Sequence, residues 1–198
     1  RHPQKTHTHR ELAKSSGLTI TVLNRYIKGR ILPSQHRSTL PLKAFQDMFN
    51  LPLEVRKRIV FDKNGYFDTT PLLSDTLLLR AVAREAARRF ADRHVTKILS
   101  PAVDGIPIAA HIANELGVDL IVAKNVKEVG IETFIEESYI PSYSGIMMAL
   151  YLPKKAISSR DRVIIVDDVI RSGETQRALI NLTNKVGAMV TGIFILVA

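Results

Sequence analysis

Cysteine is absent from this chain of 198 residues. Disulfide bonds and thiolate metal sites are therefore excluded, which fits a reducing compartment such as the cytoplasm. No apolar run approaches the roughly 18 residues that a membrane helix needs, and no apolar signal-peptide core follows the basic start of the chain. We therefore expect a soluble, cytoplasmic protein with no membrane partner, and the apolar content of 45% is typical of a globular fold.

Acidic residues are scarce in the first third of the chain. Residues 1–60 hold 12 Lys and Arg against 3 Asp and Glu, a net charge of +9, whereas residues 61–198 hold 16 of each kind. A basic segment joined to a neutral domain is typical of a module that binds a polyanion such as DNA. A solvated basic face or an RNA-binding tail would carry the same charge. No acidic partner accompanies the histidines of this region, so we expect no metal held by His2, His7, His9 and His36.

Residues 9–29 read as two short helices joined at Gly17. Glycine adopts the left-handed conformation that ends a helix, and threonine is a good N-cap for the next one. The segment resembles the helix-turn-helix of bacterial-type repressors, which implies that the second helix enters the major groove of double-stranded DNA. Arg and Asn can each form two hydrogen bonds with a base, and Lys can reach phosphate. The expected DNA contacts are Thr19, Thr21, Asn24, Arg25 and Lys28. An ordinary helical hairpin with a solvated face would show the same pattern.

The rest of the chain predicts a helical linker followed by an α/β domain. Pro41, Pro52 and a turn around Asn64 and Gly65 punctuate residues 34–70, and a long amphipathic helix is expected from about Asp75. Short strand patterns then occur between helix patterns. The expected strands are residues 97–100, 120–123, 163–166 and 189–197, and the expected helices between them are residues 108–116 and 175–186. This alternation predicts a Rossmann-like parallel sheet with crossover helices, preceded by a small all-α domain. We expect the domain boundary between residues 60 and 61.

The segment Val163–Thr175 (VIIVDDVIRSGET) places two carboxylates at the end of a buried strand. The carboxyl end of a parallel strand is where α/β folds bind ligands. Asp167 and Asp168 are suited to accept hydrogen bonds from vicinal ribose hydroxyls. The start of the following helix offers backbone N–H groups as a phosphate cradle. We expect this cradle to consist of Arg171, Ser172, Gly173, Glu174 and Thr175. Phosphate and diol recognition together indicate a phosphoribosyl ligand.

This segment resembles the motif with which type I phosphoribosyltransferases bind 5-phosphoribosyl 1-diphosphate (PRPP). Ser100–Pro107 (SPAVDGIP) resembles the diphosphate-binding loop of that family, and Lys124–Gly130 (KNVKEVG) resembles the start of the catalytic loop of its orotate-type enzymes. The resemblance covers residues 75–198 and implies a phosphoribosyltransferase domain. It adds further PRPP contacts at Asp104, Gly105, Lys124 and Lys127. It also implies that Mg²⁺ arrives with the diphosphate rather than being held by the protein.

Three positions depart from the pattern of the enzymes. Ala123 and Val129 stand where the catalytic loop has an arginine and a histidine, and Arg171 stands where the phosphate loop has a small residue. Transfer expels diphosphate, so the loss of two donors argues against catalysis. These departures and the helix-turn-helix resemble the regulator branch of the family, which includes purine repressors of Gram-positive bacteria and archaeal regulators.

The resemblance to that branch implies a transcriptional regulator of nucleotide metabolism that senses PRPP or a nucleotide. We expect a homodimer, because operators with two half-sites mirror a two-fold axis. Two alternatives stay open. One is a working adenine- or xanthine-type phosphoribosyltransferase with a DNA-binding extension, and the other is an RNA-binding regulator, which a recognition helix disfavours.

Overall fold

The computed structural model describes residues 8–34, 40, 50–63, 67–142 and 144–198. The chain divides into two compact units, Arg1–Lys57 and Arg58–Ala198. Several residues of the sequence analysis lie outside the described ranges, namely His2, His7, His36, Pro41, Asn64 and Gly65. Among the described residues, no helix combines the length and the apolar character needed to cross a membrane.

The first unit contains the two expected helices, α1 (His9–Ser16) and α2 (Ile20–Ile27). Thr8 begins α1 in a capping box with Glu11, whose carboxylate accepts a hydrogen bond of 2.7 Å from the Thr8 N–H. Gly17 ends α1 with φ of 65°, and Thr19 is the N-cap of α2. The helices enclose a small core of Ala13, Ser16 and Leu23. Helix α4 (Leu51–Arg56) starts at its N-cap Asn50.

The second unit is built on four parallel strands in the order β4-β3-β7-β8. They are β3 (Lys97–Pro101), β4 (Asp119–Ala123), β7 (Arg162–Val169) and β8 (Met189–Val197). Helix α7 (Ile106–Leu116) joins β3 to β4, and α8 (Glu174–Lys185) joins β7 to β8. The two crossovers leave β3 and β7 in opposite directions across the sheet. The carboxyl ends of these neighbouring strands therefore form a topological switch point, where ligands bind in such sheets.

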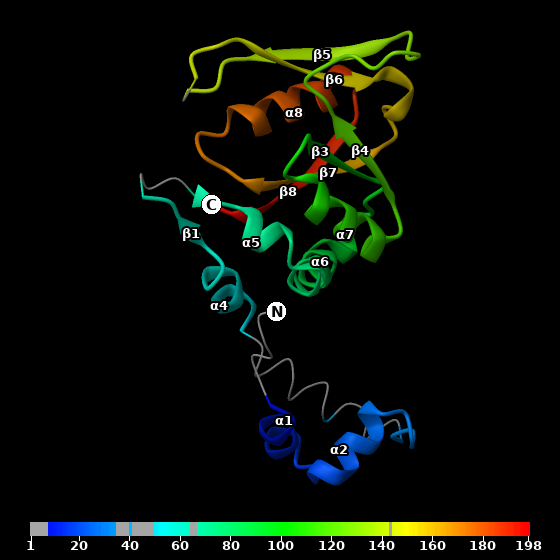
Figure 1. Ribbon diagram of the computed structural model, residues 1–198. Helices are drawn as coiled ribbons and strands as arrows, with labels where there is room; N and C mark the ends of the chain where they lie inside the picture. The colour runs from blue at the N-terminus through cyan, green and yellow to red at the C-terminus, as the bar shows by residue number, and fades with distance from the viewer. Residues whose placement is uncertain (1–7, 35–39, 41–49, 64–66, 143) are drawn as a thin grey trace. The chain divides into compact units, whose positions relative to one another are not determined.

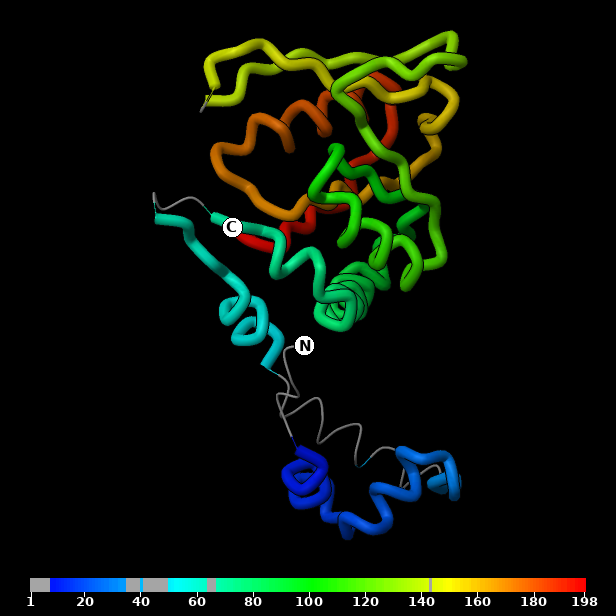
Figure 2. Tube along the Cα trace, in the orientation of Figure 1, coloured from blue at the N-terminus to red at the C-terminus, as the bar shows by residue number. Residues whose placement is uncertain are grey.

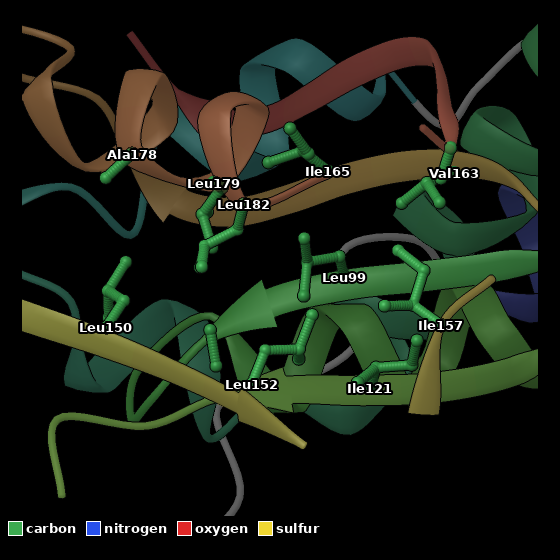
Figure 3. Packing of buried hydrophobic residues seen from close by; sticks show 12 residues of the cluster. Leu99, Ile121, Leu150, Leu152, Ile157, Val163, Ile165, Ala178, Leu179 and Leu182 are labelled. Carbon is green, nitrogen blue, oxygen red and sulfur yellow. The ribbon is translucent and has the colours of Figure 1, made fainter. Parts of the chain in front are cut away.

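Helices cover both faces of the sheet (Figures 1 and 2). Helices α6 (Thr76–Phe90) and α7 lie on one side, and α8 lies on the other. An antiparallel pair, β5 (Phe134–Tyr139) and β6 (Met148–Pro153), lies over α8. Lys124 and Tyr151 exchange backbone hydrogen bonds of 3.0 and 2.7 Å, so β6 is fastened to the end of β4. Figure 3 shows the core between these layers, formed by Leu99, Ile121, Leu150, Leu152, Ile157, Val163, Ile165, Ala178, Leu179 and Leu182.

A connector of residues 58–75 leads from the start of this unit to α6. It carries the antiparallel strands β1 (Val60–Phe61) and β2 (Phe67–Asp68) and the short helix α5 (Thr70–Leu73). An ion pair joins the first and last residues of the connector. The Arg58 guanidinium donates to Asp75 Oδ2 from Nε at 2.8 Å and from Nη2 at 2.7 Å. Asp75 in turn caps α6 by accepting a bond of 3.0 Å from the Leu78 N–H. The connector is thus fixed to the first turn of α6. Two 3-10 turns, η1 (Ala91–Arg93) and η2 (Lys154–Ala156), complete the described elements.

Candidate ligand-binding site

A pocket of about 390 Å³ opens at the carboxyl end of β7. Its volume is that of a small-molecule site, and its place is the switch point of the sheet. Four segments of the second unit contribute walls: the β2–α5 junction, the loop after β3, the connection from β5 to β6, and the β7–α8 loop. The lining residues are Phe67, Thr69, Asp104, Pro141, Asp168, Val169, Arg171, Ser172, Gly173, Glu174, Thr175 and Gln176.

The β7–α8 loop presents the start of a helix to this pocket. Gly173 has φ of 86°, a left-handed conformation that favours glycine, and α8 begins directly after it. No side chain caps the first turn of α8. The backbone N–H groups of that turn lack intrahelical partners, and they carry the positive end of the helix dipole. The loop can therefore bind an anionic group such as phosphate.

The two aspartates of β7 occupy different positions. Asp168 lines the pocket, whereas Asp167 lies behind it and is only 5% exposed. Asp167 Oδ2 accepts a bond of 2.7 Å from Gln176 Nε2, and its Oδ1 accepts one of 3.0 Å from the Asp168 N–H. Burial raises the pKa of both carboxyl groups, and the negative charge of Asp104 raises that of Asp168 further. A hydroxyl donor or a cation beside Asp168 would stabilise its ionised form.

Gly105 packs the loop after β3 against Asp167. A Cβ atom at this position would lie 2.6 Å from Ser100 Oγ and 2.8 Å from Asp167 Oδ1, closer than atoms approach in folded proteins. The missing side chain therefore lets the start of α7 reach β7. Asp104, one residue earlier, lines the pocket as a result.

The two lysines expected to contact PRPP lie outside the pocket lining. Lys124 forms an ion pair with Glu128, four residues later in the loop after β4. Lys127 Nζ lies 3.0 Å from Glu136 Oε2 on β5 and 4.9 Å from the centre of the Tyr151 ring on β6. Both lysine side chains thus have partners outside the pocket lining.

The structure brings most of the expected ligand residues together. Seven line the pocket: Asp104, Asp168, Arg171, Ser172, Gly173, Glu174 and Thr175. Gly105 and Asp167 touch each other behind the wall. Sequence reasoning missed Phe67, Thr69, Pro141, Val169 and Gln176. Gln176 could have been predicted, because a glutamine on the inner face of a helix needs a polar partner. The sequence gives no indication for Phe67, Thr69 and Pro141, because they lie outside the motifs of the family.

In the first unit, α2 exposes a polar face. Thr19, Thr21, Arg25 and Lys28 are exposed, while Leu23 faces the core. Asn24 is half-buried, and its Oδ1 lies 3.1 Å from His9 Nδ1 on α1. This contact orients Asn24 relative to the neighbouring helix. All five expected DNA contacts belong to α2 or to its two caps.

Known proteins resemble the second unit. The family model for the phosphoribosyl transferase domain matches residues 69–198. Xanthine phosphoribosyltransferase of Stutzerimonas stutzeri (strain A1501) is 31% identical over 124 residues, which are 62% of this chain and 65% of that protein. The purine biosynthesis transcriptional repressor PurR of Bacillus subtilis (strain 168) is 29% identical over 133 residues, which are 67% of this chain and 47% of that protein. The matched region thus spans less than two thirds of either relative.

A solved structure shares the fold of this unit. It is the adenine phosphoribosyltransferase from Thermoanaerobacter pseudethanolicus ATCC 33223, with a TM-score of 0.65 and 25% identity. The match covers 74% of this chain and 86% of that one. The expected α/β fold with a parallel sheet is therefore confirmed.

Proposed function

Because the chain belongs to the phosphoribosyltransferase family, we propose that its pocket binds a 5-phosphoribosyl compound such as PRPP and thereby controls DNA binding by the N-terminal unit. One observation carries the ligand assignment. The pocket combines the carboxylate of Asp168 with the uncapped first turn of α8. A carboxylate accepts hydrogen bonds from a ribose diol, and the helix start binds a phosphate.

Magnesium fits this ligand. Asp104 and Asp168 both line the pocket, and carboxylate oxygens are the ligands that Mg²⁺ prefers. The ion would offset the repulsion between these carboxylates and the diphosphate of PRPP. We expect it to enter with the ligand.

The regulatory assignment has four supports. The excess charge of the chain lies in residues 1–60, α2 exposes Arg25 and Lys28, and one matched relative is the purine biosynthesis transcriptional repressor of Bacillus subtilis. The fourth support is structural: Phe67 and Thr69 of the connector form part of the pocket wall. A ligand in the pocket therefore touches the segment that continues toward the first unit. A homodimer would present two recognition helices to a two-fold operator.

A transferase is the second candidate. The xanthine phosphoribosyltransferase is as similar to this chain as the repressor is, at 31% against 29% identity. A working enzyme would form a nucleotide from PRPP and a free base, whereas a sensor would bind PRPP without turnover.

The ligand site can be tested by calorimetric titration with PRPP and Mg²⁺. Asp168→Asn keeps the shape of the side chain but removes its charge. Charge-assisted hydrogen bonds contribute about 1.5 to 3 kcal/mol, so we expect PRPP affinity to fall by roughly 10- to 150-fold. Asp92→Asn in η1, on an exposed surface, is the matched control and should leave affinity unchanged. Equal affinities of wild type and a folded Asp168→Asn protein would contradict the diol role.

The coupling can be tested with a DNA duplex selected from a random pool. Operator affinity is measured with and without saturating PRPP at fixed salt and Mg²⁺. We expect PRPP to weaken DNA binding, and DNA must then weaken PRPP binding by the same factor. If PRPP binds but leaves DNA affinity unchanged, the pocket is not a sensor for that DNA.

A further inference from the structure

The phosphate-binding loop already holds an anion of the chain itself. Ser172 Oγ donates a hydrogen bond to the carboxylate of Glu174, the first residue of α8. Ser142, from the connection between β5 and β6, donates its own hydroxyl to Ser172 Oγ at 2.8 Å. Hydrogen bonds to the Glu174 carboxylate lower its pKa; the largest effect comes from the Ser172 hydroxyl, the next from the backbone N–H of Glu174, and a smaller one from Ser142. Glu174 is therefore ionised at neutral pH.

This carboxylate shares the donors that a phosphate would use. Glu174 and Ser172 both line the pocket, and the positive end of the α8 dipole favours one anion there. A second anion would face repulsion from Glu174 as well as from Asp104 and Asp168. A phosphate bound at this helix start would therefore compete with the Glu174 carboxylate for one subsite.

The connection between β5 and β6 is tied to the same hydrogen bonds. We call its described residues, 140–142 and 144–147, the β5–β6 connection. Its large apolar side chains are exposed, with Ile140 at 52%, Ile146 at 69% and Met147 at 70%. Apart from the buried Pro141, apolar burial therefore contributes little to holding the segment in place. The Ser142 bond to Ser172 therefore links the position of the connection to the state of the phosphate loop, beside the pocket wall that Pro141 forms.

We propose that Glu174 determines which anions this pocket accepts: its carboxylate occupies the phosphate subsite in the ligand-free protein, and a phosphate enters only by displacing it. Displacement turns Ser172 toward the ligand and breaks its bond with Ser142, which releases the β5–β6 connection. The identity of the natural ligand rests on the function proposed above. The competition itself concerns any phosphate monoester or inorganic phosphate.

An ordinary role for Glu174 makes a different prediction. A glutamate in the first turn of a helix stabilises that helix through the dipole. If this were its only role, Glu174→Gln would lower stability without raising phosphate affinity. The sign of the change in affinity therefore separates the two roles.

The test compares wild type, Glu174→Gln and Ser142→Ala in the full chain. Inorganic phosphate and ribose 5-phosphate are titrated at constant ionic strength. We expect Glu174→Gln to bind both about tenfold more tightly, which corresponds to about 1.4 kcal/mol. Ser142→Ala, which leaves α8 unchanged, should show a smaller gain. Glu132→Gln removes an exposed carboxylate outside the pocket and should bind as wild type does.

A second readout needs no ligand. Amide hydrogen exchange of the β5–β6 connection should be faster in Glu174→Gln and Ser142→Ala than in wild type, because both changes weaken the link through Ser172. Unchanged exchange together with unchanged phosphate affinity would overturn the proposal.

Titration with PRPP distinguishes a failure of this competition from a failure of the proposed phosphoribosyl site. If wild type and Glu174→Gln bind PRPP equally well, the phosphoribosyl site stands and the competition is refuted. If neither protein binds PRPP, while Glu174→Gln binds phosphate more tightly and its β5–β6 connection shows faster amide exchange, the competition stands and the phosphoribosyl ligand is refuted.

Discussion

Alanine at position 105 would test the contact that joins the loop after β3 to the acidic strand. Gly105 has φ of −70° and ψ of −21°, a conformation open to any residue. The loss of freedom in the unfolded chain would therefore stabilise Gly105→Ala by about 0.4 to 1 kcal/mol. The added Cβ would lie 2.6 Å from Ser100 Oγ, 2.8 Å from Asp167 Oδ1 and 3.3 Å from Asp167 Cα. Such overpacking costs about 1 to 3 kcal/mol, so the middle values of the two ranges give a net loss of about 1.3 kcal/mol.

Urea denaturation of the ligand-free protein measures this loss. Ser100→Ala removes the nearest atom, and its hydroxyl makes only a long bond of 3.4 Å to the Pro101 carbonyl. The double variant Ser100→Ala/Gly105→Ala should therefore recover part of the stability that Gly105→Ala loses. Recovery should be incomplete, because the contact with Asp167 remains. PRPP affinity should also fall in Gly105→Ala, since its neighbour Asp104 lines the pocket.

Two results would refute this reasoning. The first is a Gly105→Ala protein as stable as wild type, which would mean that the loop yields without cost. The second is a double variant whose change in unfolding free energy equals the sum of the single changes, because contacting residues must show a coupling energy.

Three further predictions concern the two proposed activities and the acidic pair. We expect no nucleotide from PRPP and any purine or pyrimidine base, because Ala123 and Val129 cannot donate to leaving diphosphate; sustained diphosphate release would favour the transferase. Arg25→Ala should lower specific DNA affinity by about 1 to 3 kcal/mol, whereas Lys28→Ala should mainly reduce the salt dependence, as measured by fluorescence anisotropy on matched and random duplexes. Burial raises the pKa of Asp167, so the stability it contributes is complete below the unfolded value of about 3.9 and is lost as pH rises through the folded pKa. Asp167→Asn should therefore flatten the fall in unfolding free energy toward neutral pH, and an unchanged urea-denaturation profile would contradict this.

The sequence patterns predicted the sheet better than its surroundings. All four parallel strands lie where the alternation of strand and helix patterns indicated. Strand β7 runs past its four apolar residues to Val169, because Asp167 and Val169 remain paired with Ile195 and Val197 of β8. Backbone pairing with a neighbour thus extends the strand through residues of low strand propensity.

The β5–β6 pair escaped prediction for a related reason. The segment Phe134–Tyr139 reads FIEESY, and adjacent glutamates do not indicate a strand. In the structure, Glu137 accepts from Asn181 Nδ2 at 2.7 Å and pairs with Lys185 Nζ at 2.6 Å, both on α8. Tertiary contacts therefore stabilise this strand. Such contacts join residues far apart in sequence, and single-sequence patterns do not contain them.

The pocket residues also differ in whether a single stretch of sequence could reveal them. The β7–α8 segment could be identified because one continuous run supplies a strand end, a carboxylate and a helix start. Phe67 and Thr69 could not, because only the folded connector brings them to that run. The linker of residues 34–70 was expected to carry short helices; α4 lies there as expected, but β1 and β2, which were not expected, follow it before α5.

The connector is the place where the two proposed functions make different demands. A transferase needs its pocket walls only to bind and orient substrates, so Phe67 and Thr69 would serve as passive walls. A sensor must bind its ligand differently in the DNA-free and DNA-bound states, so some ligand contact must change when the first unit changes state. The Arg58 to Asp75 ion pair fixes the start of the second unit to α6, and the strands that follow lead directly to Phe67. A change of the chain at Arg58 therefore has a short covalent path to the pocket. The proposed sensor would use this path, whereas a transferase would not require it.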